Sequence, residues 1–257
     1  MAVAPLPPVS PSPSTTPVAP PLSEGARIIN TFIAPSKTFT DLRRSAAWWA
    51  PFLLMVICST AMVYTAGQKI GFRRIMENQM QAQPKAQARL ENLPADQRER
   101  QMEQGAKVTG IISYIFPIFT LMIWLLIALF LWATFKVGVG ANVSYGTSLG
   151  IVVYSGLPLS LKVVLATLSI VAGMSPESFS FQNPLASNPG YFMNPTDGVF
   201  MYSLATGLDI FMIWTLVLTA IGFTCVSKIK TGTAYAVVFG WWLVLTVAGA
   251  AIGAAFS

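Results

Sequence analysis

Histidine is absent from this 257-residue sequence, and cysteine occurs only twice. Without histidine there can be no Ser-His-Asp triad, no Cys-His pair, no His-ligated zinc and no haem held by a proximal His. The two cysteines, Cys58 and Cys225, cannot build a disulfide framework or a Cys-rich metal site. Chemistry based on Ser, Asp or Glu remains open, but no paired carboxylates lie in the apolar stretches. We therefore predict a protein without catalytic residues, metal or cofactor.

Charge is also scarce. Charged residues make up 10% of the chain and hydrophobic residues 54%, whereas an average soluble chain is about a quarter charged. Only seven charged residues follow Lys107: Lys136, Lys162, Glu177, Asp197, Asp209, Lys228 and Lys230. This composition excludes an ordinary water-soluble enzyme and indicates an integral membrane protein.

The gaps between charges are long enough for membrane spans. A spanning helix needs about 20 mostly apolar residues, because the hydrocarbon core is about 30 Å thick and a helix rises about 1.5 Å per residue. Five stretches meet or approach this length. They are about 47–67, 108–135, 148–172, 205–226 and 232–256. The predicted fold is an all-α polytopic membrane bundle of five transmembrane helices within residues 47–257.

Proline is concentrated at the start of the chain, where eight of the 18 prolines lie in residues 1–22. Proline removes backbone donors and prevents helix formation, whereas a secretory signal needs a basic start and a helical apolar core. Residues 1–22 are therefore predicted to form a disordered Pro-rich tail. Such a tail serves more often as a spacer than as a ligand for a proline-reading domain.

Residues 23–46 are predicted to form two amphipathic helices separated at Ala34-Pro35. One arrangement places them in the headgroup layer of the membrane, and the other packs them on the end of the bundle. In the first arrangement, a set of basic and aromatic residues would contact anionic headgroups and the interface. This set is Arg27, Lys37, Arg43, Arg44, Trp48 and Trp49.

The segment 68–107 is polar and contains eight Lys or Arg and five Asp or Glu residues. It is predicted to form a polar helical insertion between the first and second spans. Its positive charges are mixed with negative ones and Phe72 is the one aromatic residue among them, so the basic character does not indicate a nucleic-acid partner.

Orientation follows from the distribution of Lys and Arg. An N-terminus inside the cell places Lys136, Lys228 and Lys230 inside as well, and it leaves the cation-free segment 173–204 and the C-terminus outside. The eight positive charges of 68–107 count against this orientation, but that segment also carries acids and is long enough to cross as a small domain. We predict a cytoplasmic N-terminus and an outside C-terminus in a bacterial cytoplasmic membrane.

Two ionisable residues fall within predicted spans, Lys162 in the third and Asp209 in the fourth. A lone charge in hydrocarbon costs roughly 3 kcal/mol on insertion scales, so such residues usually pair or face water. The candidate is an ion pair that fixes helix register or lines a polar cavity; the alternative is a snorkelling Lys162 and a helix-capping Asp209. Pro117 and Pro158 also lie in spans and are expected to kink them.

Three stretches, 27–51, 145–162 and 208–223, resemble the bacterial branch of the Yip-domain family, named for Ypt/Rab-GTPase-interacting proteins. The first contains a short helix, a proline, a basic Phe-containing helix and an aromatic span opening, and the second contains Tyr154 four residues before Pro158. The third is an apolar span followed by a short basic turn. The resemblance implies a five-span membrane protein with a cytoplasmic N-terminal region that binds partners, and it carries over no catalytic residues.

Two functions remain open. The first is a non-enzymatic protein that organises membrane or partner proteins through its N-terminal helices, with another membrane protein or a second copy of the chain as partner. The second is a small transporter or channel-like protein in which Lys162 and Asp209 line a polar path. The two hypotheses differ in whether Lys162 and Asp209 meet in a water-accessible cavity or in a dry contact.

Overall fold

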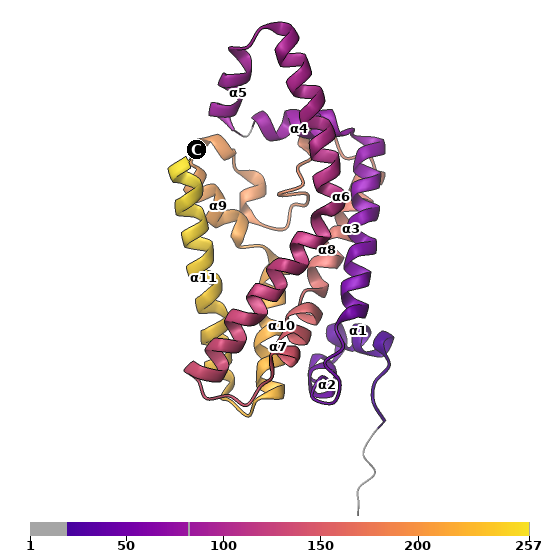
Figure 1. The fold of residues 1–257 in the computed structure, drawn as a ribbon, viewed down its shortest axis with the longest axis vertical. Helices are drawn as coiled ribbons and strands as arrows, with labels where there is room; N and C mark the ends of the chain where they lie inside the picture. Colours follow the sequence, from indigo (N-terminus) through magenta and orange to yellow (C-terminus); the bar gives the residue numbers. More distant parts are fainter. Residues whose placement is uncertain (1–19, 82, 257) are drawn as a thin grey trace, which may run out of the picture.

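The computed structural model describes residues 20–81 and 83–256 of the chain. In these residues the fold is helical throughout, as predicted. Four helical stretches are long and apolar enough to cross a membrane, and a bent helix pair makes a fifth if it is counted as one span. The helices form an elongated bundle with polar segments at both ends (Figure 1). Most of the predicted Pro-rich tail, residues 1–19, lies outside the described residues.

Two short helices, α1 (Glu24–Ile33) and α2 (Pro35–Asp41), lie at one end of the bundle. The Ser23 side chain caps α1 by accepting a hydrogen bond from the Ala26 amide, 3.2 Å long. Pro35 occupies the first turn of α2, where its missing N–H costs no hydrogen bond. The C-terminal end of α6 and the α10–α11 turn lie at the same end, which we call the N-terminal end (Figure 1).

The first span, α3 (Trp49–Lys69), leads to the polar helices α4 (Phe72–Gln81) and α5 (Pro84–Glu91) at the opposite end. The next helix, α6, runs without interruption over Ala95–Ala133 and ends in a π-helical turn, η1 (Thr134–Gly138). The polar insertion and the second span therefore share one helix. Pro117 lies inside α6, which remains α-helical through it.

The third span is divided into α7 (Tyr145–Ser155) and α8 (Leu157–Val171) at Gly156. A Cβ atom at Gly156 would lie 2.7 Å from the ring of Trp124 in α6, so the break coincides with a close approach between helices. Pro158 is in the first turn of α8. It therefore lies at a helix start, where its missing N–H is tolerated.

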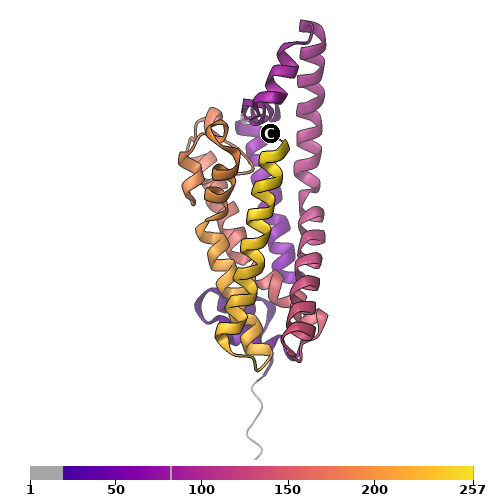
Figure 2. The same ribbon diagram turned by 90° about the vertical axis from the view of Figure 1, so that its left-hand side faces the viewer.

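A loop with three 3-10 turns crosses the opposite end: η2 (Pro176–Ser178), η3 (Pro189–Phe192) and η4 (Pro195–Asp197). The chain continues as α9 (Val199–Gly207) and α10 (Ile210–Val226), which are bent by 53° at Leu208-Asp209. The predicted fourth span, 205–226, thus contains a helix break. The last helix, α11 (Thr231–Phe256), packs mainly on α9 and α10 (Figures 1 and 2).

Apolar packing is divided between the two ends. The larger cluster joins α2, α6, α7, α10 and α11, and at its centre the rings of Phe135 and Phe223 stack with centroids 4.0 Å apart. A smaller cluster at the opposite end joins α3, α4 and α8 through Met62, Ile75 and Ile170. The larger cluster places the N-terminal helices against the spans and so positions the first of two buried polar networks.

Candidate functional site

The first polar network ties α1 and α2 to the bundle. Arg27 is 2% exposed, and its Nη2 lies 2.8 Å from Asp41 Oδ2 while its Nη1 lies 3.1 Å from Glu24 Oε1. The hydroxyl of Tyr154 in α7 donates a 2.6 Å hydrogen bond to Glu24 Oε2. We call these four residues, Glu24, Arg27, Asp41 and Tyr154, the Arg27 network. It connects both N-terminal helices to a span.

Backbone and hydroxyl groups complete the surroundings of Arg27. Thr31 and Thr38 each donate a 2.8 Å hydrogen bond to the Arg27 carbonyl oxygen, so one acceptor joins α1 to α2. The Leu22 amide donates to Asp41 at 3.3 Å. Burial opposes the charge on Arg27, but the hydrogen bonds to its partners and the nearby Glu24 carboxylate outweigh it, so the pKa of Arg27 lies above its ordinary value. The guanidinium therefore stays charged.

Apolar packing also holds α2 against the bundle. Phe39 and Leu42 are fully buried in the larger cluster. Gly222 of α10 permits this approach, because a Cβ atom there would lie 3.2 Å from Phe39 and 2.5 Å from Ile151. The buried faces of α1 and α2 thus pack on the end of the bundle, the second arrangement that the sequence allowed.

The prediction that Arg27 contacts lipid headgroups is therefore wrong, because its side chain is buried between two carboxylates. Lys37, Arg43 and Arg44 are exposed at the same end, and so is Trp49. Trp48 is half-buried, with its ring against Phe52 at a centroid distance of 5.8 Å.

The exposed side chains of α1, of α2 and of the turn after α2 include apolar and basic groups. Ile29 and Ile33, one helical turn apart on α1, are 60% and 75% exposed. Lys37 and Arg43 are exposed close by in sequence. We call Ile29, Ile33, Lys37 and Arg43 the α1–α2 face. It combines apolar side chains and positive charge on a segment that the Arg27 network fixes in place.

The second polar network surrounds Asp209 at the break between α9 and α10. Lys162 Nζ in α8 lies 2.6 Å from Asp209 Oδ2, so the structure brings together the two charges that the sequence placed within spans. The same oxygen accepts hydrogen bonds from the Ser187 hydroxyl and from Asn188 Nδ2, the latter at 3.3 Å. The other oxygen caps α10 by accepting from the amides of Phe211 and Met212.

This contact is largely buried, although Asn183 beside it also lines a polar pocket of about 530 Å³. The Lys162 and Asp209 side chains are 16% and 7% exposed, and Asn183, Ser187 and Asn188 are buried around them. Asn183 and Asn188 also hydrogen-bond each other through their side-chain amides, at 2.7 and 3.3 Å. We call Lys162, Asn183, Ser187, Asn188 and Asp209 the Asp209 network. Because both Asp209 oxygens are occupied by protein donors, the geometry fits a structural clamp better than a polar path.

The sequence does not distinguish the carboxylates that pair with Arg27, or the polar residues that surround the Lys162–Asp209 pair. Ser187, Asn188 and Asn183 belong to a Ser- and Asn-containing loop between two spans, and that composition was the available signal. Asp41 and Glu24 lie in the charge-rich N-terminal region, where no single carboxylate stands out. Tyr154 was noted only for its spacing to Pro158.

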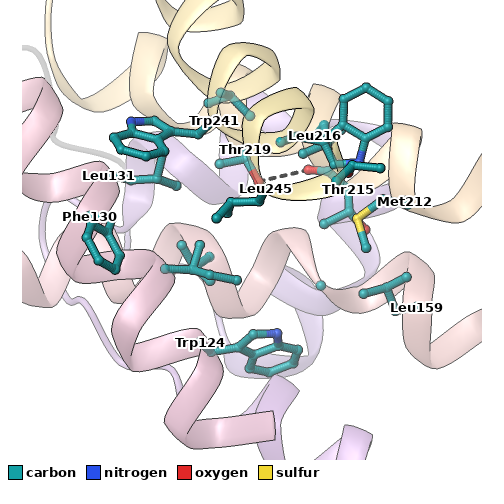
Figure 3. Close-up of a pocket in the computed structure, with 16 residues that line it drawn as sticks. Trp124, Phe130, Leu131, Leu159, Met212, Thr215, Leu216, Thr219, Trp241 and Leu245 are labelled. Atoms are coloured by element: carbon teal, nitrogen blue, oxygen red, sulfur yellow. Dashed lines mark hydrogen bonds between the residues drawn. The ribbon is translucent and has the colours of Figure 1, made fainter. Parts of the chain in front are cut away.

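An apolar cavity of about 380 Å³ lies between α6, α7, α8, α10 and α11. Figure 3 shows Trp124, Trp241, Met212 and Leu159 among its lining residues. Neither Lys162 nor Asp209 lines it, and its lining contains no charged residue. Among the described residues, no group of three or more His, Cys, Asp or Glu is placed to hold a metal ion.

The chain was compared with known proteins. The family model described as Yip1 domain matches residues 29–252. This range includes the Lys162–Asp209 pair, the first four predicted spans and most of the fifth. No curated protein and no solved structure matched the chain.

Proposed function

The chain belongs to the Yip1 domain family of membrane proteins, and we propose that it organises membrane or partner proteins through the α1–α2 face. Proteins of this family interact with membranes and with other proteins. The observation that carries the proposal is the combination of an exposed Ile29–Ile33 pair with a buried Arg27 network beneath it. Exposed apolar side chains on a fixed support are typical of an interaction surface.

The chemistry of the face fits an anionic membrane surface with a membrane-protein partner on it. Lys37 and Arg43 supply positive charge near the headgroups, and each such residue contributes about 1 kcal/mol of attraction to an anionic leaflet. Ile29 and Ile33 then lie at the depth where apolar residues of interfacial helices insert. A second copy of the chain or another membrane protein would meet the face in this layer. Nothing in this role requires a reaction.

The proposal includes an orientation and a location. With α1, α2, Lys136, Lys228 and Lys230 on the cytoplasmic side of a bacterial cytoplasmic membrane, the C-terminus and the cation-free segment 173–204 lie outside. The positions of these basic residues at the N-terminal end support this orientation. A reporter fused after Ser257 is expected to be active only outside the cytoplasm, and cytoplasmic activity would overturn the orientation.

Photocrosslinking in native membranes tests the function. A photoreactive residue at Ser36, which is exposed between Ile33 and Lys37, is expected to yield adducts with anionic lipid and with one recurrent membrane protein. The double variant Ile29→Glu, Ile33→Glu should abolish the protein adduct, because it places carboxylates in an apolar contact. Val137→Glu is the matched control, since Val137 is 83% exposed at the same end but lies outside α1 and α2. An adduct pattern that is unchanged in the double variant would overturn the proposal.

A further inference from the structure

We propose that the seam between α6 and α11 binds one anionic phospholipid, with an acyl chain in the apolar cavity and the headgroup at Lys136, Lys228 and Lys230. The site uses none of the residues of the α1–α2 face. It can therefore fail or succeed independently of the proposed function.

The cavity reaches the lipid-facing surface. Phe130 of α6 and Leu245 of α11 both line it, and they are 56% and 58% exposed. Nearer the N-terminal end, α11 contacts α6 and η1 directly. The Trp241 indole donates a 3.0 Å hydrogen bond to Thr134, and its ring lies 5.9 Å from that of Phe130 between centroids. Beyond this point the cavity lies beside hydrocarbon.

The lining excludes water and favours a hydrocarbon chain. The hydroxyls of Thr215 and Thr219 donate to carbonyls of their own helix, at 2.9 and 2.8 Å, and the Trp241 N–H is bonded to Thr134. A buried water needs two to four polar partners, whereas the wall of this cavity is mainly hydrocarbon, with Thr and Trp residues as the source of its few polar atoms. An empty cavity would forfeit dispersion contacts along its whole wall. An acyl chain from the adjacent bilayer restores those contacts without desolvating any polar group.

Charge selects the headgroup. Three lysines are exposed at the N-terminal end of the bundle: Lys136 just after α6, and Lys228 and Lys230 just before α11. The Lys136 ammonium lies 5.2 Å from the centre of the Trp132 ring. Within the described part of the chain, the carboxylates at this end are Glu24 and Asp41, and both are engaged in the Arg27 network. The lysines are thus left to attract an anion from outside the protein.

Distances along α11 fit a single phospholipid. Val238, the lining residue of α11 nearest Lys230, is eight residues further on, or about 12 Å at the helical rise. One leaflet of hydrocarbon is about 15 Å deep, half of the bilayer core. A headgroup at Lys230 therefore places the distal part of its acyl chain at the cavity. An inner-leaflet lipid satisfies both the charged and the apolar parts of the site.

The test uses the full-length protein in nanodiscs that contain phosphatidylcholine and a phosphatidylglycerol with a diazirine at the end of one acyl chain. After illumination, peptide mass spectrometry is expected to find adducts concentrated on the cavity lining, including Trp241 and Leu245. Leu245→Trp fills the mouth and should lower these adducts at least about fivefold, equivalent to about 1 kcal/mol. Leu243→Trp is the matched control, since Leu243 is 54% exposed on the same helix and does not line the cavity.

Headgroup selection is tested in the same nanodiscs. The double variant Lys228→Gln, Lys230→Gln should weaken the preference for phosphatidylglycerol over phosphatidylcholine about fivefold per lysine, while Lys69→Gln, at the exposed last turn of α3 at the opposite end, should leave it unchanged. Should Leu245→Trp fail to fold, Leu245→Phe and the adduct map of the unaltered protein serve instead. Adducts spread evenly over the lipid-facing helices, or equal labelling by a phosphatidylcholine probe, would each overturn the proposal.

Discussion

The Arg27 and Asp209 networks both hold helices together where the chain breaks its helical path, but the charge at the centre is positive in the first and negative in the second. In the first, one guanidinium is shared between two carboxylates from α1 and α2; in the second, one carboxylate gathers an ammonium, a hydroxyl, an amide and two backbone N–H groups. Each lies where the helical path is interrupted, at Ala34 or at Leu208-Asp209. In an apolar bundle, the hydrophobic effect does not favour helix against helix over helix against lipid. Directional charge therefore adds to the side-chain packing that fixes the interrupted segments.

The two networks differ in the number of ion-pair partners that each buried cation has. Lys162 has Asp209 as its ion-pair partner, and Asp209 also caps a helix. Arg27 has two carboxylates, and Glu24 is 29% exposed, so part of that network is open to water. We therefore expect the Asp209 network to be the less tolerant of substitution.

Removal of the Asp209 carboxylate is expected to have the largest effect. In Asp209→Ala, the Lys162 ammonium loses its counter-ion in a buried site, and the amides of Phe211 and Met212 lose their acceptor. Breaking a buried pair by removal of one partner costs about 3–5 kcal/mol. Equilibrium unfolding in mixed micelles would measure the loss.

The double variant Lys162→Met, Asp209→Asn is the control for that prediction. Asparagine keeps a capping oxygen for α10, and both charges are gone, so most of the lost free energy of unfolding should return. A double variant as unstable as Asp209→Ala would show that the ion pair is not the origin of the effect.

Replacement of Arg27 is expected to rank second. Arg27→Met leaves Asp41, 7% exposed, with the Leu22 amide as its remaining donor. Because that donor remains and Glu24 can turn to water, we expect a loss of about 3 kcal/mol, the lower end of the range for a broken buried pair. Faster hydrogen exchange confined to α1 and α2 would identify the site of the damage.

Arg43→Met is the matched control, because Arg43 is exposed and lies just beyond α2. A surface substitution of this kind should change the free energy of unfolding by less than about 0.5 kcal/mol. If Arg27→Met and Arg43→Met lowered the free energy of unfolding equally, the Arg27 network would not be what holds α1 and α2.

The comparison also explains what the sequence could predict. Lys162 and Asp209 drew attention because each is isolated in an apolar stretch, where charge is costly. Arg27 and Asp41 carry an equally buried pair, yet they lie in a region rich in charge, where composition does not separate a buried arginine from an exposed one. The membrane class and the helical fold followed from apolar length alone.

The hydrophobic pattern of the sequence did not predict where the helices begin and break. The second predicted span began at residue 108, whereas α6 begins at Ala95, because nothing in the polar sequence interrupts the helix there. The break at Leu208-Asp209 is stabilised by Ser187 and Asn188, which are distant in sequence. Its one sign in the sequence is Asp209, the candidate helix cap, which caps α10. Contacts between segments far apart in the chain decided both networks.

A smaller effect is expected where the Arg27 network meets the bundle. Tyr154→Phe removes the hydroxyl that donates a 2.6 Å hydrogen bond to Glu24, and it leaves the ring in place. A hydrogen bond to a charged group contributes about 1.5–3 kcal/mol, and because Glu24 is partly exposed we expect a loss near the lower limit. Tyr64→Phe, a change at a 59% exposed tyrosine of α3, should leave unfolding unchanged. If Tyr154→Phe also had no effect, the network would end at α1 and α2 and would not reach the spans.

The smallest changes in the free energy of unfolding are expected at two buried serines, Ser187 and Ser160. Ser187 donates to Asp209, whereas the Ser160 hydroxyl, also buried, has no hydrogen-bond partner among the described residues. Ser187→Ala is expected to cost about 1–2 kcal/mol in the free energy of unfolding, because Asp209 loses one of its donors. Ser160→Ala should be neutral or slightly stabilising, since it removes a desolvated hydroxyl that gains nothing in return. If the two variants were equally stable in mixed micelles, burial alone would account for the polar groups of this bundle, and the hydrogen bonds around Asp209 would not be what holds the α9–α10 break.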